Sequence, residues 1–296
     1  GVWAYKFIPL FFYLYIMTDT LFTRTPHEIL MQNIEDDCFV DTSIPIEYPP
    51  VALSFGEKLI KNPKGDSLLP IPLGTYGNFS CVSAPPKTKK TFFISLLASV
   101  YLSGQNIYGG DIKGHRDKGH LVHFDTEQGL WHCQKVFKRV YDMDSTIDPN
   151  IYHTFGLRSI SYKQRLAFIE HYLSKKINTP SLVIIDGIAD LVSDVNNIEE
   201  SNATVQKLMQ WSAVYKCHII CVIHHNYGTA KMTGHLGSFL EKKTECQIEL
   251  EANTVNKDWI TVNCKRSRGY AFETFSFKVN ERGLPVIVEN LYDPLK

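Results

Sequence analysis

Between residues 78 and 224, short apolar runs rich in β-branched residues alternate with stretches whose apolar residues recur at helical spacing. Each run of the first kind predicts a strand, and each stretch of the second kind predicts a helix. The predicted strands are 79–83, 120–125, 151–155, 181–186 and 218–224, and the predicted helices are 90–102, 129–141, 162–175 and 199–215. Strands that are apolar along their whole length, with helices between them, indicate a parallel sheet covered on both faces.

The pattern changes in the last quarter of the chain. A predicted helix near 235–243 is followed by successive runs of strand character at 246–251, 259–265, 273–279 and 285–289. Successive strands without helices between them indicate antiparallel pairing, here on the same sheet. The predicted fold class is therefore α/β, with a mostly parallel sheet, helices on both faces and an antiparallel C-terminal extension.

The residues before position 78 follow neither pattern. The apolar run 7–17 is too short to span a bilayer, and we expect 1–16 to be an extension outside the fold of a protein without a membrane segment. The sequence 25–28, Thr-Pro-His-Glu, predicts a capped helix start. Six prolines between 41 and 78, around one helical stretch near 55–60, predict an arm or lid. The predicted organisation is 1–16, a helix and proline-rich arm over 17–77, and the main domain over 78–296.

Composition narrows the class of protein. A hydrophobic fraction of 44% and a charged fraction of 21% exclude a disordered chain and a coiled coil. The 31 basic and 31 acidic side chains give a formal net charge of zero, so a nucleic acid would have to be bound by a local basic loop or by an oligomer. Seven cysteines, an odd number without a CxxC pair, predict reduced core thiols in a cytoplasmic protein.

The segment 83–93 lies between a predicted strand and a predicted helix, where a phosphate-binding loop belongs. In such a loop backbone N–H groups surround the phosphates, a lysine reaches the terminal phosphates, and a Ser or Thr binds Mg²⁺. The residues expected around a bound nucleotide are Ala84, Pro85, Pro86, Lys87, Thr88, Lys89, Lys90, Thr91 and Phe92. Against the pattern GxxxxGK[ST], Ala84 and Lys89 replace both glycines, so a basic turn that caps an ordinary helix remains the alternative for this motif alone.

Three further features follow predicted strands in order. Four apolar residues lead to Asp186, as in a strand whose acid holds the Mg²⁺ shell, although many buried strands end in an Asp that caps a helix. Glu127 follows the strand 120–125 and can orient or deprotonate a water molecule. His225 follows the strand 218–224. Ligands of open parallel sheets bind outside the carboxyl ends of the strands, where all of these features meet.

This ordered set resembles the RecA-like branch of P-loop ATPases, including RepA-type replicative helicases and ATPases carried on bacterial mobile elements. The resemblance covers about residues 45–290, and Phe124 to Glu127 is its most specific part, because this branch carries its catalytic base on that strand. Consistently, Gly187 and not an acid follows Asp186. The resemblance implies a RecA-like ATPase domain over 78–296 that uses ATP and Mg²⁺. It places the Walker A Lys and Thr, the Walker B Asp, the catalytic Glu and the sensor at Lys90, Thr91, Asp186, Glu127 and His225.

The resemblance also implies partners. RecA-like ATPases form rings or filaments, and a basic pair in a late strand can reach the neighbour's γ-phosphate, so we predict that Arg266 or Arg268 acts across an interface; a solvated basic turn is the alternative. The glycine-rich loops 104–119 and 226–237 are candidate contacts for single- or double-stranded DNA, with flexible solvated loops as the equal alternative.

The sequence therefore predicts an ATP-binding and ATP-hydrolysing RecA-like ATPase associated with DNA in replication, recombination or mobilisation. A degenerate P-loop switch or interaction module with little or no hydrolysis is the alternative, because both loop glycines are missing. A regulatory domain that binds no nucleotide is the third hypothesis.

Overall fold

The computed structural model describes residues 25–61, 65–104, 111–175, 180–226, 229 and 231–288, so the predicted extension 1–16 lies outside the described residues. The chain divides into two compact units, Gly1–Tyr48 and Pro49–Lys296. In the first, helix α2 (Pro26–Cys38) begins at the predicted capping box: the Thr25 side chain accepts from the backbone of Glu28, and the Glu28 side chain accepts from the backbone of Thr25. No residue of α2 is buried.

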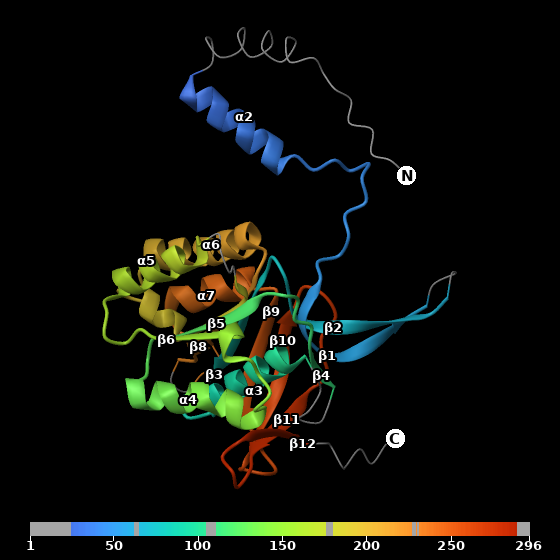
Figure 1. Cartoon of the computed structure of the whole chain (residues 1–296), viewed down its shortest axis with the longest axis vertical. Helices are drawn as coiled ribbons and strands as arrows, with labels where there is room; N and C mark the ends of the chain where they lie inside the picture. The colour runs from blue at the N-terminus through green and yellow to red at the C-terminus, as the bar shows by residue number, and fades with distance from the viewer. Residues whose placement is uncertain are drawn as a thin grey trace. The chain divides into compact units, whose positions relative to one another are not determined.

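Within its described residues, the second unit is built on a nine-stranded sheet in the order β12-β11-β10-β9-β3-β8-β7-β5-β6 (Figure 1). The strands from β9 to β6 are parallel, whereas β10, β11 and β12 continue the sheet in antiparallel pairs. Their bounds are β3 (Phe79–Ala84), β5 (His120–Asp125), β6 (Tyr152–Gly156), β7 (Pro180–Asp186), β8 (His218–His224), β9 (Cys246–Ala252), β10 (Trp259–Ser267), β11 (Phe275–Val279) and β12 (Pro285–Val288). The predicted α/β class is confirmed.

Helices cover both faces of this sheet, as Figure 1 shows. The helices are α3 (Lys90–Ser103), α4 (Leu130–Met143), α5 (Tyr162–Leu173), α6 (Ile198–Tyr215) and α7 (Gly234–Lys243), with short 3₁₀ turns η1 (Pro149–Ile151) and η2 (Ile188–Leu191). Two apolar clusters separate the faces, one with α3 and α4 and the other with α5, α6 and α7. Along β3, Val82 packs in the first cluster and Cys81 in the second, because successive strand residues point to opposite faces.

Residues 51–75 form a hairpin that the sequence did not predict. Strands β1 (Val51–Ile60) and β2 (Ser67–Thr75) pair with each other, and β4 (Ile112–Gly114) completes a three-stranded antiparallel sheet. The helix predicted near 55–60 is therefore wrong. The base of the hairpin belongs to the core, because Leu53 and Leu73 are buried in the cluster that holds α3. The compact unit accordingly begins at Pro49, so that it includes residues 49–77, which the sequence analysis assigned to the arm.

Two further observations bear on composition. All seven cysteines are free, and five of them are buried, in keeping with the predicted core thiols. None of the helices in the described ranges has the length and apolarity that crossing a bilayer would need.

Candidate functional site

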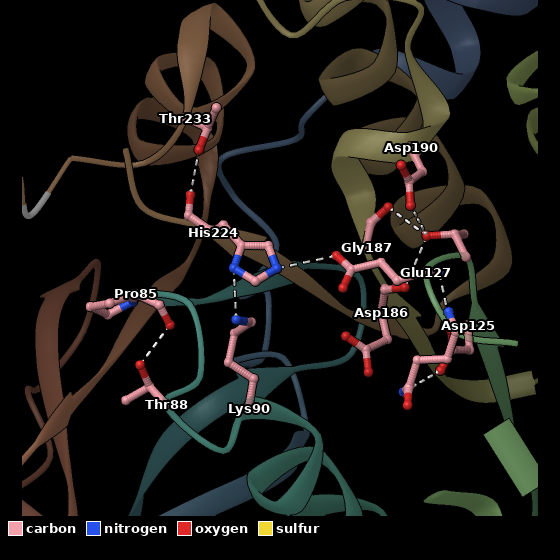
Figure 2. A network of polar contacts seen from close by, with 12 residues as sticks. Pro85, Thr88, Lys90, Asp125, Glu127, Asp186, Gly187, Asp190, His224 and Thr233 are labelled. Atoms are coloured by element: carbon pink, nitrogen blue, oxygen red, sulfur yellow. Dashed lines mark hydrogen bonds and ion pairs between the residues drawn. The ribbon is translucent and has the colours of Figure 1, made fainter. Parts of the chain in front are cut away.

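The turn between β3 and α3 lies at the carboxyl edge of the parallel strands. Thr88 Oγ1 donates to the carbonyl oxygen of Pro85 at 2.6 Å, which ties the turn together (Figure 2). Two of its residues have left-handed backbone conformations without being glycine, Lys87 with φ of 65° and Lys89 with φ of 54°. Lys89 therefore adopts the conformation for which glycine is usually chosen, at a cost of about 1–2 kcal/mol. The loop keeps a left-handed residue directly before the helix although the glycine is missing.

Lys90 begins α3 with its side chain directed into the site (Figure 2). Only 8% of the residue is exposed, and its Nζ lies 2.9 Å from Nδ1 of His224. Burial lowers the pKa of Lys90, and the negative charges of Glu127 and Asp186 act in the opposite direction. The loop thus presents a buried lysine to the crevice at the strand ends.

His224, the last residue of β8, joins Lys90 to Glu127. Its Nε2 lies 3.4 Å from Glu127 Oε1, and this hydrogen bond is the main cause that lowers the pKa of Glu127 (Figure 2). A lowered pKa keeps Glu127 ionised, which a general base requires. Lys90, His224 and Glu127 come from three separate segments and form one polar chain.

The sequence analysis placed the sensor at His225, but the structure brings the preceding residue to the site. His225 is buried on the other side of the strand, where its Nε2 lies 3.4 Å from Glu249 Oε1, and Lys265 Nζ lies 2.5 Å from the same oxygen. Because neighbouring strand residues point in opposite directions, a step of one position moves a side chain out of the site. His225 thus belongs to a separate buried charge cluster.

Asp186 ends β7 beside Glu127 and is 3% exposed. Burial, followed by the charges of Asp125 and Glu127, raises its pKa to about 8. Its Oδ2 atom has no hydrogen-bond partner within the described residues. A buried carboxylate oxygen without a partner fits a hydrated cation, and Thr91, in the first turn of α3, is the second residue that would hold Mg²⁺.

Among the described residues, no group of three or more His, Cys, Asp or Glu side chains could hold a metal ion by itself. This agrees with Mg²⁺, which binds through one or two protein ligands together with substrate phosphates and water. When bound, the ion neutralises charge on the phosphates. Zinc, which needs three or four protein ligands, does not fit the described part of the chain.

The structure adds supporting residues that the sequence analysis missed. The Asp125 carboxylate accepts from the backbone N–H groups of Glu127, at 3.0 Å, and Gln128, at 2.8 Å, and so fixes the turn that carries Glu127. Thr126 Oγ1 lies 2.9 Å from Oδ2 of Asp190. Figure 2 shows Asp125 and Asp190 around the same turn. The acid at the end of β5 was visible in the sequence, but its role as a clamp on the turn was not.

Gly187 permits the close approach of these segments. Its φ is 104°, and a Cβ atom at this position would lie 2.2 Å from Thr126 Oγ1 and 2.8 Å from Glu127 Cγ. Any side chain would therefore push Glu127 out of its place. The sequence did carry a signal for this contact, because a glycine follows Asp186 directly.

Arg266 and Arg268 lie away from this site within their own chain. Arg266 stands opposite Gln247 of β9, level with the first half of β3, and therefore toward the amino edge of the parallel strands. Its guanidinium pairs with Glu241 at 2.8 Å, and the guanidinium of Arg268 donates to the carbonyl oxygen of Lys243 at 3.0 Å. These pairings direct both arginines to α7 and not to the phosphate loop of the same chain.

The two predicted DNA loops are partly ordered elements of the core. Residues 105–110 of the first loop and 227, 228 and 230 of the second lie outside the described residues. Strand β4 occupies part of the first loop and pairs with β1. In the second loop Met232 and Leu236 are buried, and α7 begins at Gly234. Contacts with a polymer would have to use the exposed remainder.

Comparisons with known proteins agree with this fold. The AAA domain family matches residues 53–230, which is more than half of the chain. The solved structure of the ATPase domain of a helicase is similar, with a TM-score of 0.54 at 13% identity, over 72% of this chain and 85% of that chain. At this identity the likeness concerns the fold. No sequence among the curated proteins matches the chain.

Proposed function

Because the chain belongs to the AAA domain family and has the RecA-like P-loop ATPase fold, we propose that it hydrolyses ATP at the loop 84–92. The observation that carries this proposal is the convergence of Lys90, Glu127 and Asp186 from three segments, with His224 between the first two. A buried cation, an ionised base and a carboxylate oxygen open to a metal ion are the groups that phosphoryl transfer to water requires.

The residues divide the work as follows. Lys90 and the N-terminus of α3 bind the phosphates, while Thr91 and Asp186 hold Mg²⁺. Glu127 orients the attacking water and accepts its proton. His224, rather than His225, takes the sensor role, because its ring contacts both the phosphate-binding lysine and the base.

We also propose that Arg266 or Arg268 completes the site of a neighbouring copy in a ring or filament. Their distance from the loop of their own chain fits a role across an interface. Mixing Glu127→Gln subunits with Arg268→Ala subunits should then restore part of the turnover, because some interfaces regain both intact groups. The idea fails if Arg266→Ala and Arg268→Ala each leave the turnover and its dependence on protein concentration unchanged.

The partner we propose is DNA, in replication, recombination or mobilisation, within a reducing cytoplasm that suits the free cysteines. Support comes from the fold, which is similar to the ATPase domain of a helicase, and from Lys118 and Lys231, which are exposed in the two candidate loops. The deciding experiment measures ATP hydrolysis with and without single-stranded DNA. Stimulation by DNA is expected, and absence of Mg-ATP binding in calorimetry would refute the assignment of the whole site.

A nucleotide-binding switch is the second candidate, and the left-handed Lys87 and Lys89 favour it, because a strained loop can bind phosphates without reaching the geometry for rapid turnover. Tight binding of Mg-ATP with negligible hydrolysis, with or without DNA, would support the switch over the ATPase. Lack of nucleotide binding would leave the regulatory domain.

A further inference from the structure

A cavity of about 620 Å³ adjoins the phosphate loop on the side away from Glu127. Its walls include Lys89 of the loop, Asn256, Asp258 and Trp259 from the β9–β10 turn, and Lys278 and Asn280 from β11 and the turn that follows it. The volume lies within the range of small-molecule sites, about 300–1,000 Å³. One aromatic ring among several polar side chains is the lining expected for a nucleoside.

Sheet topology fixes where this cavity lies. Strand β9 runs parallel to β3, so its carboxyl end and the start of β10 lie at the same edge of the sheet as the phosphate loop. Trp259 pairs with Lys278 across the strands β10 and β11, which places both side chains on one face. The ammonium group of Lys89 donates to the carbonyl oxygen of Asp258 at 3.1 Å and connects the loop to this turn.

The chemistry of a nucleotide gives the site a direction. In a nucleoside triphosphate the terminal phosphate and the nucleoside are at opposite ends. Glu127 and Asp186 follow β5 and β7, which lie on one side of β3 beyond β8, so the terminal phosphate belongs on that side. The nucleoside must then extend to the other side of β3, where β9 to β12 lie.

Resting on the proposed function, we infer that this cavity holds the base and ribose of the bound nucleotide, with Trp259 as a wall and Lys89 as a positioning residue. A glycine at position 89 would have no side chain to reach Asp258. The lysine both adopts the left-handed conformation that the loop needs and ties the β9–β10 turn to the loop. Substitution of the loop glycine thus gives this chain a contact between its phosphate site and its nucleoside site.

The test compares the binding of Mg-ATP with that of Mg-tripolyphosphate, which has phosphates and no nucleoside, by calorimetry. The parent protein should bind ATP at least about tenfold more tightly, because only ATP fills the cavity. Trp259→Ala and Lys89→Gly should each weaken ATP binding severalfold and leave tripolyphosphate binding unchanged, and Trp259→Phe should restore ATP binding. Trp131→Ala, which removes an exposed tryptophan on α4, is the matched control and should change neither.

The possible results separate the inference from the function on which it rests. Equal affinity for both ligands in the parent, or equal losses for both ligands in Trp259→Ala, would overturn the nucleoside site while leaving the phosphate site in place. Failure of both ligands to bind the parent would overturn the proposed function and the inference together. A variant that only disturbs folding would lower both affinities, so the ratio of the two reports on the cavity itself.

Discussion

Lys90 and His224 lie 134 positions apart in the sequence, yet Nζ of the lysine is 2.9 Å from Nδ1 of the histidine. An ammonium group only donates hydrogen bonds, so Nδ1 must accept, and the proton of a neutral ring then resides on Nε2. Nε2 faces Glu127, to which it can donate. One histidine ring therefore links the phosphate-binding lysine to the catalytic base with a defined direction for each hydrogen bond.

Removing the loop lysine tests the phosphate site. Lys90→Ala should weaken Mg-ATP binding by roughly 1.5–3 kcal/mol, or about 10–150-fold, because it deletes charge-assisted hydrogen bonds to the phosphates. Lys87→Ala is the matched control, since Lys87 is an exposed lysine of the same loop, and it should have a much smaller effect. Equal losses in the two variants, measured by calorimetry, would mean that the loop acts only through its overall charge.

Glu127→Gln separates binding from catalysis. The variant should bind Mg-ATP with nearly the parent affinity and lose about 10²–10⁴-fold in turnover, because an amide cannot accept the proton of the attacking water. Glu199→Gln, on the exposed first turn of α6, provides the control. Retained turnover in the Glu127 variant would remove it from the role of base.

His224 should set the acid side of the pH dependence. Its hydrogen bond lowers the pKa of Glu127, so Glu127 stays ionised as the pH falls. In His224→Ala this pKa rises, and the acid limb of the kcat/KM profile should move to higher pH. His225→Ala should not move that limb, because His225 lies in the cluster of Glu249 and Lys265. A profile that shifts in the second variant and not in the first would reverse the assignment.

The buried carboxyl of Asp186 should make stability depend on pH. Its pKa is raised to about 8 in the folded chain, against about 3.9 when unfolded, so between these values folding takes up a proton and the free energy of unfolding falls as pH rises. Asp186→Asn removes this dependence. The stability difference should grow in favour of the variant from about pH 5 to pH 8, by at most about 1.4 kcal/mol per pH unit. A constant difference in denaturant titrations would show that Asp186 titrates normally.

Gly187 should tolerate no side chain. Gly187→Ala should cost about 2–4 kcal/mol of unfolding free energy, because it combines a left-handed φ with contacts to Thr126 and Glu127 that are too close. Gly77→Ala is the control: φ is 85°, but no atom lies within 4 Å of a Cβ placed there, so only the backbone cost of about 1–2 kcal/mol remains. Thermal unfolding of both variants gives the comparison, and equal losses would exclude the steric effect.

The sequence predicted the strands of the nine-stranded sheet because each is an unbroken apolar run bounded by polar residues. It did not predict β1 and β2, since Pro70 and Pro72 suggest an irregular segment. These prolines are tolerated because β2 is an edge strand of the small sheet and its outer side needs no N–H donors. Only the partner strand shows where such a proline can be accommodated.

The site shows the same limit. Lys90, Glu127 and Asp186 stand at the ends of predicted strands or at a helix start, so topology alone brings them to one edge. The choice between His224 and His225 depends on which face of β8 each side chain takes, and a strand apolar on both sides gives no alternation from which to read it. The left-handed Lys89 likewise follows from the closed loop and not from the preference of lysine.

The pairing of β3 also dictates when the site can form during synthesis. Contacts of β3 with β8 and β9 join residues 141 and 165 positions apart, as in Ser80 with Cys221 and Ser83 with Ile248. A nascent chain therefore leaves the ribosome with both edges of its central strand unpaired until most of the sheet has been made. Contacts this distant in sequence fold slowly, so such a chain will depend on chaperones to prevent aggregation through β3. The phosphate loop, although encoded in the first third of the chain, is completed among the last parts of the fold.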